Sequence, residues 1–315
     1  MPVLLPSERP LDIDAGSDLW SDWLLHRRHG DDAAHAHEVR AEITRYADRV
    51  LDGACLQPHM TLADIGTGDG LVALRAIERI GPSLRVVMTD VSAPLLRHAQ
   101  AQAAQRGVGS QCAFVHAPAG RLAGIGDASV DAVTLRAVLA YVPDKLAALR
   151  ECARILKPGG RLSMAEPVLR DEALEVCALK KLVDARAPGD GDPFFPLLLR
   201  WRAAQYPDTE EKVRQLPITN YGERDLVRFA IDAGFVDIHL ELHIDVRAEG
   251  AMSWNTFVRT SPHPWAPPLA AILAERFSAD ERDFFEARLR PLVERGRQFG
   301  ALRIAYLTAR KPAAA

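Results

Sequence analysis

Between residues 60 and 167, short apolar runs alternate with helix-length segments, and this alternation restricts the possible folds more than any other feature of the chain. The runs typical of strands are TLADIG, LRVVMTDV, QCAFVHA, VDAVTLRAV and RLSMAEP. The segments typical of helices are LVALRAIERI, APLLRHAQAQAAQRG and DKLAALRECARILKPGG, the last with Asp144 placed to cap it. Near-continuous apolar strands that alternate with helices predict a parallel sheet covered on both faces. Ligands of such sheets bind at the carboxyl ends of the strands.

The remainder of the chain is less regular and divides into three further parts. Residues 1–57 are expected to form an N-terminal helical lid in front of a core at residues 58–168. Residues 169–218, rich in proline and aromatic residues, are expected to be an insertion on the substrate side. Residues 219–315 are expected to complete the sheet, with a second helical insertion at about residues 248–300. Within this part, FVDIHLELHIDV alternates with period two and predicts a strand nearer an edge, and ALRIAYLTAR predicts a last strand.

The segment LADIGTGDG, at residues 62–70, joins the first strand to the first helix through a glycine loop. Its spacing is GxGxG, whereas dinucleotide dehydrogenases use GxGxxG. The carboxylates of Asp64 and Asp69 suit a cationic ligand better than a pyrophosphate. The loop therefore points away from NAD, and a nicotinamide-dependent oxidoreductase remains an alternative.

The motifs of the core resemble those of the class I S-adenosylmethionine-dependent methyltransferases that act on small molecules. LADIGTGDG is similar to the first motif of that family, and VVMTDVS is similar to the second. The stretch from SVDAVTLRAV to LKPGGRLSMAEP is similar to the fourth strand, the following helix and the LKPGG turn of the family. The resemblance covers about residues 55–167, a third of the chain. It implies an α/β fold with a Rossmann-like sheet, S-adenosylmethionine as cofactor, and methyl transfer.

The resemblance also implies roles for particular residues. The glycine loop would wrap the amino acid part of the cofactor, Asp90 would accept from both ribose hydroxyls, and Val91 would pack on the adenine. Where the family usually carries an acid after the third strand, this chain has FVHAPAGRL, so the adenine would depend on the backbone of Ala119 and Gly120. Arg136, at the end of the fourth strand, would contact the cofactor or the substrate, with a surface ion pair as the alternative. The cofactor-binding candidates are Asp64, Gly66, Thr67, Gly68, Gly70, Asp90, Val91, Ala119, Gly120 and Arg136.

Candidates for the acceptor side have no family motif behind them. An oxygen acceptor needs its proton removed, and the candidate bases are Glu166, His26 and His116, each with a structural role as the alternative. The aromatic cluster WSDWLLHRRHG predicts either a lid over the site or ordinary helix packing. The candidate substrate contacts are Trp23, Arg27, Tyr141, Tyr206, Asn220, Tyr221 and Trp254. The alternative for the aromatic residues is that they fill small cores within the insertions.

Composition excludes several classes of function. Lys plus Arg is 39 and Asp plus Glu is 42, so there is no basic excess of the kind that nucleic-acid binding needs. No apolar run reaches the length of a membrane span, and the first residues lack the pattern of a signal peptide. The four cysteines form no CxxC pair, which favours a reduced, cytoplasmic protein. His35 and His37 point to different sides of a helix, so no metal site is expected.

The sequence thus predicts a cytoplasmic enzyme that transfers a methyl group from S-adenosylmethionine to an oxygen, nitrogen or carbon atom of a small, partly apolar molecule, in secondary metabolism. No nucleic-acid or membrane partner is expected, and a homodimer is left open. The rival hypotheses are a methyltransferase-fold protein with non-methylating chemistry, the oxidoreductase named above, and an interaction protein whose helical insertions bind a partner.

Overall fold

A seven-stranded sheet forms the centre of the protein, in the order β3-β2-β1-β4-β5-β7-β6. The structure, a computed structural model, describes residues 17–186, 191–248, 250–297 and 299–314. The strands are β1 (Thr61–Ile65), β2 (Arg85–Asp90), β3 (Cys112–His116), β4 (Val130–Arg136), β5 (Leu156–Pro167), β6 (Val236–Ala248) and β7 (Phe299–Arg310). Strands β1 to β5 pair in parallel, and β7 runs antiparallel between β5 and β6. The predicted parallel sheet is confirmed, as is the edge position of the sixth strand.

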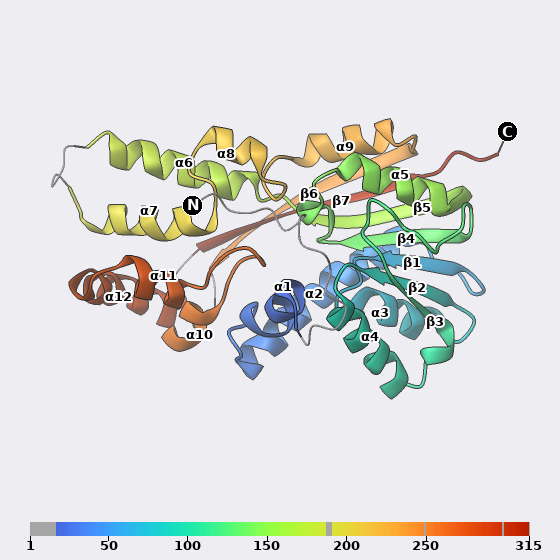
Figure 1. The fold of residues 1–315 in the computed structure, drawn as a ribbon, viewed down its shortest axis with the longest axis horizontal. Coiled ribbons are helices and arrows are strands. Elements are labelled where there is room, and N and C mark those ends of the chain that lie inside the picture. Colours follow the sequence, from blue (N-terminus) through green and yellow to red (C-terminus); the bar gives the residue numbers. More distant parts are fainter. Residues whose placement is uncertain (1–16, 187–190, 249, 298, 315) are drawn as a thin grey trace.

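Two layers of helices cover the sheet, as Figure 1 shows. One layer packs on β1 to β5 and holds α2 (Ala33–Ala54), α3 (Leu71–Ile80) and α4 (Ala93–Gln105). The other packs on β5, β6 and β7 and holds α5 (Lys145–Ile155) and α9 (Glu223–Asp232). Two short 3₁₀ segments, η3 (Gly109–Gln111) and η4 (Leu139–Tyr141), precede β3 and follow β4. The expected coverage of both faces is confirmed.

Local sequence signals fix the ends of the core helices. The Asp144 carboxylate accepts from the Ala147 backbone N–H at 2.9 Å and caps α5, as predicted.

The KPGG segment differs from expectation, because it belongs to β5 and not to a turn after the helix. In that segment the Lys311 N–H donates to the Gly160 carbonyl, so the end of the chain pairs with this stretch of backbone and extends the strand.

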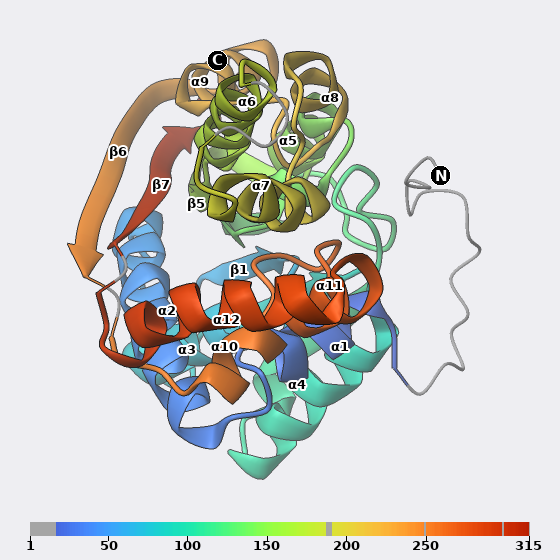
Figure 2. The same ribbon diagram turned by 90° about the vertical axis from the view of Figure 1, so that its left-hand side faces the viewer.

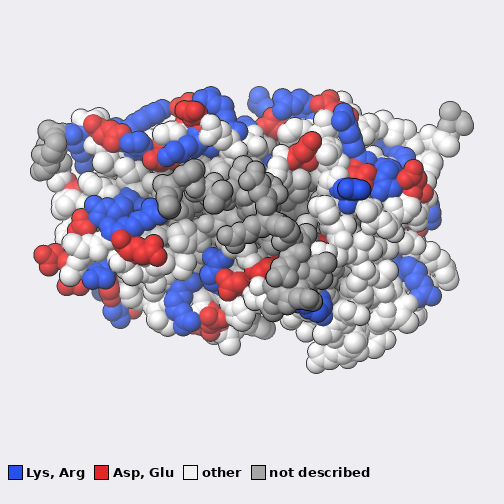
Figure 3. Space-filling model, viewed as in Figure 1, with Lys and Arg blue, Asp and Glu red and all other residues white. Residues whose placement is uncertain are grey.

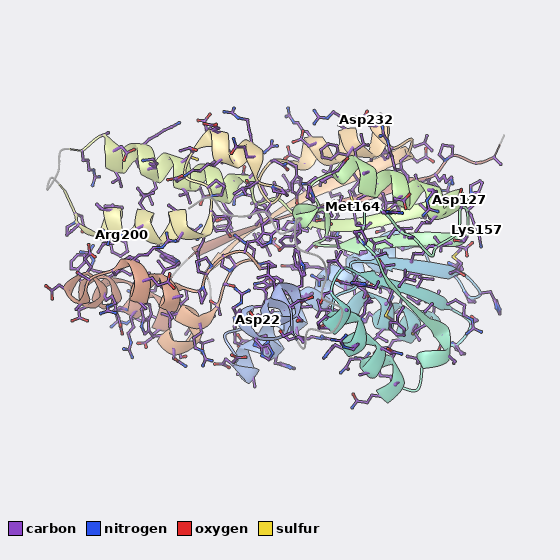
Figure 4. All side chains as sticks on the ribbon, viewed as in Figure 1. Asp22, Asp127, Lys157, Met164, Arg200 and Asp232 are labelled. Carbon is purple, nitrogen blue, oxygen red and sulfur yellow. The ribbon has the colours of Figure 1, made fainter. Side chains whose placement is uncertain are left out.

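In the described parts of the two segments predicted as insertions lie six further helices. They are α6 (Arg170–Asp184), α7 (Phe194–Gln205), α8 (Glu210–Gln215), α10 (Trp254–Arg259), α11 (Leu269–Arg276) and α12 (Ala279–Glu294). Figure 2 shows α7 and α12 facing each other. Their shared apolar core includes Leu197 of α7 and Phe285 of α12. Arg200, labelled in Figure 4, bridges the two segments by donating to the Arg276 carbonyl and the Glu281 carboxylate. The two segments therefore form one helical body.

The N-terminal part of the described chain connects this helical body to the sheet. It consists of α1 (Leu19–Asp22), the π-helix η2 (Trp23–Arg27) and α2. Asp22, labelled in Figure 4, accepts from Arg27 Nε. The other guanidinium nitrogens of Arg27 donate to the Pro264 and Ala266 carbonyls, and Trp23 Nε1 donates to the Ser261 carbonyl at 3.0 Å. The segment is thereby tied to the residues that precede α11.

The face of the molecule in Figure 3 carries interspersed positive and negative side chains. No helix in the described part of the chain is long and apolar enough to cross a membrane. Within the same residues, no group of three or more His, Cys, Asp or Glu side chains is arranged to hold a metal ion.

Candidate active site

The glycine loop between β1 and α3 adopts a backbone that only glycine takes without strain. Gly66, Gly68 and Gly70 have φ angles of +63°, +57° and +80°. A Cβ at Gly66 would lie 2.5 Å from Val138 Cγ2, and a Cβ at Gly68 would lie 3.1 Å from Leu24 Cδ2. The loop is therefore enclosed on one side by the residues after β4 and on another by the N-terminal segment.

A Gly66→Ala substitution is expected to destabilise the protein by about 3 kcal/mol, because it combines a left-handed backbone with a clash against Val138. Gly107→Ala is the matched control, since Gly107 also has a positive φ, +71°, but has open space around it. The control is expected to cost about 1 kcal/mol. Urea denaturation measures both, and equal costs would show that Val138 does not restrain the loop.

The Asp64 side chain holds the glycine loop in place through hydrogen bonds. Its carboxylate accepts from Thr67 Oγ1 at 2.7 Å and from Thr134 Oγ1 at 2.8 Å, and the side chain is buried. Burial raises the pKa of Asp64 to about 6. Thr67 in turn donates its backbone N–H to the Thr89 carbonyl. Asp64 and Thr67 therefore hold the loop between β2 and β4.

Asp90 presents its carboxylate at the carboxyl end of β2. Its Oδ2 accepts from the Gly68 N–H at 2.8 Å and its Oδ1 accepts from the Ser92 N–H at 2.9 Å. Burial raises the pKa of Asp90 to about 6. Each carboxylate oxygen can accept more than one hydrogen bond, so this orientation leaves both oxygens able to accept from a ligand.

Val91, His116, Ala119 and Gly120 lie on the β3 side of the loop. The His116 ring sits at the end of β3, where its Nε2 donates to the Val91 carbonyl at 3.0 Å. The Ala119 and Gly120 N–H groups make no hydrogen bond within the described residues. Strands β3 and β4 are three positions apart in the sheet, or about 14 Å at the usual strand spacing. The structure therefore separates His116 from the residues that follow β4.

Two arginines come from the elements on the β4 side of the loop. Arg136 is the last residue of β4, and Arg28 directly follows η2 with its guanidinium 5.2 Å above the Trp23 ring. Burial, followed by the charge of Arg136, lowers the pKa of Arg28 to about 9, and the charge of Asp69 acts in the opposite direction. Arg136 Nε is buried without a partner, and neither guanidinium pairs with a carboxylate among the described residues.

Three aromatic rings from three different segments pack together next to these arginines. Tyr141 of η4 lies 5.2 Å from Trp20 of α1 and 5.6 Å from Trp265, which precedes α11, and the two tryptophans are 6.2 Å apart. All three pairs have edge-to-face geometry, which aromatic pairs favour. The Tyr141 hydroxyl makes no hydrogen bond within the described residues, and burial raises its pKa. We call Trp20, Tyr141 and Trp265 the aromatic trio.

The Glu166 side chain forms its hydrogen bonds with backbone N–H groups. Its side chain is fully buried, and its carboxylate accepts from the Val138 N–H at 3.0 and 3.1 Å and from the Ala140 N–H at 3.2 Å. Burial raises the pKa of Glu166. This arrangement fixes the start of η4, and so the placement of Tyr141.

The three N-terminal candidates, His26, Trp23 and Arg27, differ in what they contact. His26 is more than half exposed and pairs with Asp31 at 2.9 Å. Trp23 and Arg27 use their polar atoms to attach the N-terminal segment to the residues before α11. These contacts attach the N-terminal segment to the second insertion.

Of the four remaining candidates, Tyr206, Tyr221 and Trp254 are buried in packing positions, and Asn220 is half-buried. Tyr206 contacts the His263 ring at 5.3 Å, and Trp254 stacks on Phe257 within the helical body. The Tyr221 hydroxyl donates to the Pro167 carbonyl. The Asn220 side chain accepts from Lys145 Nζ, which lies 4.8 Å above the Tyr221 ring. Trp254 belongs to the apolar core of the insertions and is not brought to the glycine loop.

Comparison with known proteins decides the family. Residues 63–164 match a family described as "Methyltransferase domain". Nocamycin O-methyltransferase of Saccharothrix syringae is 33% identical over 219 residues, which cover 66% of this chain and 72% of that enzyme. The chain belongs to the class I S-adenosylmethionine-dependent methyltransferases. S-Adenosylmethionine is therefore its methyl donor.

Two further similarities agree with this family. A ubiquinone/menaquinone biosynthesis C-methyltransferase of Hahella chejuensis is 35% identical over 116 residues, 37% of this chain and 46% of that enzyme. Among solved structures, the YcgJ protein of Bacillus subtilis matches over 86% of this methyltransferase and 99% of its own chain, with a TM-score of 0.52 at 17% identity. The structural likeness is one of fold, and it agrees with the predicted Rossmann-like sheet.

Sequence reasoning missed two residues that the structure of this methyltransferase brings to the site, Arg28 and Trp265. Both stand in segments that the sequence does mark, LLHRRHG and SPHPWAPP. Arg27 and Arg28 are adjacent, and the π-helix η2 adds a residue to its turn, so α-helical spacing does not predict which of them faces the loop. Trp265 lies outside any helix or strand, so no periodicity indicates its direction.

Proposed function

We propose that this methyltransferase transfers the methyl group of S-adenosylmethionine to an oxygen, nitrogen or carbon atom of a small, partly apolar organic molecule. The observation that carries the proposal is the aromatic trio, which brings the N-terminal segment, η4 and the second insertion together beside the glycine loop. Ligand sites for small molecules combine apolar and aromatic walls with few polar groups. The named acceptor of the Saccharothrix relative supports a small organic acceptor and a role in natural-product biosynthesis.

The residues that follow β1, β2 and β3 at their carboxyl ends fit S-adenosylmethionine. Asp90 offers two oriented carboxylate oxygens for the ribose hydroxyls, and Val91 follows it toward the adenine side. Ala119 and Gly120 offer backbone N–H groups without another partner among the described residues. The positive φ angles of Gly66 and Gly68 give the loop the tight turn at which we propose that the amino acid part of the cofactor binds.

When bound, S-adenosylmethionine supplies a methyl group that its sulfonium has already activated. The protein then has to align the acceptor atom in line with that methyl group and to exclude water. The trio supplies apolar walls for both tasks, and the contacts of Trp23 and Arg27 hold one of those walls in place. The acceptor atom stays open, since the two relatives described above are named for O- and C-methylation.

No base is assigned, because the three candidates do not meet beside the trio. His26 pairs with Asp31 at the surface, His116 lies three strands away from β4, and Glu166 accepts from backbone N–H groups. For an oxygen or nitrogen acceptor, we infer a reactive atom with an available lone pair at neutral pH, such as an aromatic amine or an acidic hydroxyl that has already ionised.

The experiment is to incubate the enzyme with methyl-labelled S-adenosylmethionine and a panel of small amines and acidic hydroxy compounds, with transfer RNA and an unrelated protein as macromolecular acceptors. Label is expected in a low-mass product, together with one S-adenosylhomocysteine per methyl group. A Trp265→Ala variant is expected to lose about tenfold or more in kcat/KM, the scale on which a buried aromatic anchor contributes. Exclusive labelling of RNA or protein would contradict the proposal.

A further inference from the structure

Strand β6 leaves a long edge of the sheet without a partner strand. It has 13 residues and stands last in the sheet order, and among the described strands it pairs with β7 alone. Figure 2 shows it along the outer side of the sheet. Such an edge presents a row of free backbone N–H and C=O groups, which form a template for another strand unless the edge is protected.

An irregularity protects only the start of this edge. The register with β7 shifts between Val236 and His239, and Asp237 there has a φ of +51°. From His239 to Ala248 each residue of β6 has a partner in β7 in unbroken order. A bulge protects an edge by bending and twisting the strand locally. Residues 240–248 are therefore left able to pair with another strand.

Apolar side chains are exposed along this regular part of β6. Leu242, Ile244 and Val246 are 37%, 53% and 67% exposed, and they alternate along one face of the strand. Leu240, two positions earlier, packs against the core cluster that includes Leu226 of α9. The apolar row thus extends beyond the part that the core covers, and its three exposed members need a partner surface to be buried.

The other face of β6 carries histidines and acids in alternation. His239, Glu241, His243 and Asp245 occupy every second position, and both histidines hydrogen-bond to Glu241 at 3.2 Å. Charged side chains usually discourage the pairing of an edge strand. Here the alternation allows an acid to meet a histidine on a neighbouring strand, and an imidazole N–H can donate to a carboxylate whether or not the ring is charged.

The alternation selects among the ways in which β6 can pair with its own copy. In a regular antiparallel pair of identical strands, the two-fold axis passes beside one residue, which then lies opposite itself. An axis at Glu241 or at His243 places like groups opposite each other, which is destabilising. An axis at Leu242 or at Ile244 places each acid opposite a histidine.

We infer that this methyltransferase forms a two-fold dimer in which residues 240–248 of β6 pair antiparallel with the same residues of a second copy, with the axis at Ile244. This axis brings the exposed apolar residues together, because Leu242 then lies opposite Val246 of the second copy. It also places His243 opposite Asp245 of that copy and leaves the irregular start of β6 outside the pairing. The two seven-stranded sheets become one continuous sheet.

The test measures the oligomeric state of the full chain by sedimentation velocity at about 1 to 100 µM, since a dimer dissociates on dilution. The wild type is expected to reach twice the mass of the chain within this range. Ile244→Lys places two ammonium groups opposite each other at the axis, and it is expected to raise the dissociation constant at least about 100-fold. Val236→Lys is the matched control, because it changes another exposed apolar residue of β6 outside the paired residues, and it is expected to dimerise as the wild type does.

A pair of charge changes tests the register. Asp245→Lys places a cation opposite His243 and is expected to weaken the dimer about tenfold. The double variant His243→Glu/Asp245→Lys restores an opposite-charge pair only with the axis at Ile244, and it is expected to return the dissociation constant to within about threefold of the wild type. An axis at Leu242 would instead place the new glutamate opposite Glu241 and would give no rescue.

Two further measurements separate dimerisation from folding. Urea denaturation of the variants at low concentration, where every form is monomeric, is expected to give the stability of the wild type, because the changed side chains are exposed or at the edge. Amide hydrogen exchange of residues 240–248 is expected to slow as the wild type dimerises. A wild type that stays monomeric throughout overturns the inference, and so does a dimer that Ile244→Lys leaves intact. A double variant without rescue overturns the register.

Discussion

Asp90→Asn is expected to weaken S-adenosylhomocysteine binding about 100-fold. The carboxylate stands at the end of β2 with both oxygens oriented by backbone N–H groups, and we propose that it accepts from the two ribose hydroxyls. Hydrogen bonds to a charged partner contribute about 1.5–3 kcal/mol each, and asparagine replaces one accepting oxygen with an NH₂ group that cannot accept. Calorimetric titration measures the change directly.

The same variant tests a dependence on pH. Burial raises the pKa of Asp90 to about 6, so the free enzyme protonates this carboxyl in mildly acidic solution. The hydroxyl donors of the ribose favour the ionised form, and affinity is therefore expected to rise as the pH increases through about 6 and to fall below it. Asp90→Asn removes this titration.

Ser92→Ala is the control for Asp90→Asn. It deletes the hydroxyl that accepts from the Leu95 N–H and caps α4, but it keeps the backbone N–H that orients Asp90. It is expected to cost about 1 kcal/mol of stability and little affinity. Equal affinities of wild type and Asp90→Asn across this pH range would show that Asp90 does not hold the ribose.

Glu166→Ala is expected to lower the free energy of unfolding by about 4 kcal/mol. The substitution leaves the Val138 and Ala140 N–H groups buried without their acceptor, and each such loss costs about 1–3 kcal/mol in addition to the cavity that remains. The start of η4 then loses its anchor, so Val138 no longer supports Gly66. Urea denaturation and S-adenosylhomocysteine titration are expected to show losses together.

Glu166→Gln separates a positioning role from a catalytic one. Glutamine keeps one accepting oxygen for the η4 backbone, and the expected cost is about 1–2 kcal/mol with affinity nearly unchanged. If this variant instead has the stability and cofactor affinity of the wild type and no longer transfers methyl groups, Glu166 acts on the acceptor and the positioning role is wrong.

The sequence predicts the core well because its signals there are local. Hydrophobic runs, the cap at Asp144 and the turn at the glycine loop each act within a few residues, and the structure has each in the expected place. The edge position of β6 follows from its period-two alternation in the same way. These features need no knowledge of how distant segments pack.

The acceptor side depends on long-range packing, and there the sequence is less informative. Glu166 ends a strand where ligand-binding residues are common, yet its carboxylate turns to the backbone of η4, a contact that no local pattern indicates. Trp254 and Trp265 stand in the same insertion, and only the folded chain shows that the first fills the helical body and the second joins Trp20 and Tyr141.

A crystal structure of the enzyme with S-adenosylhomocysteine tests the proposed site most directly. The expected result is that the ribose hydroxyls lie within hydrogen-bond distance of the Asp90 carboxylate and that the sulfur faces the aromatic trio. A ligand bound away from the glycine loop, or one whose sulfur faces away from Trp20, Tyr141 and Trp265, would contradict it.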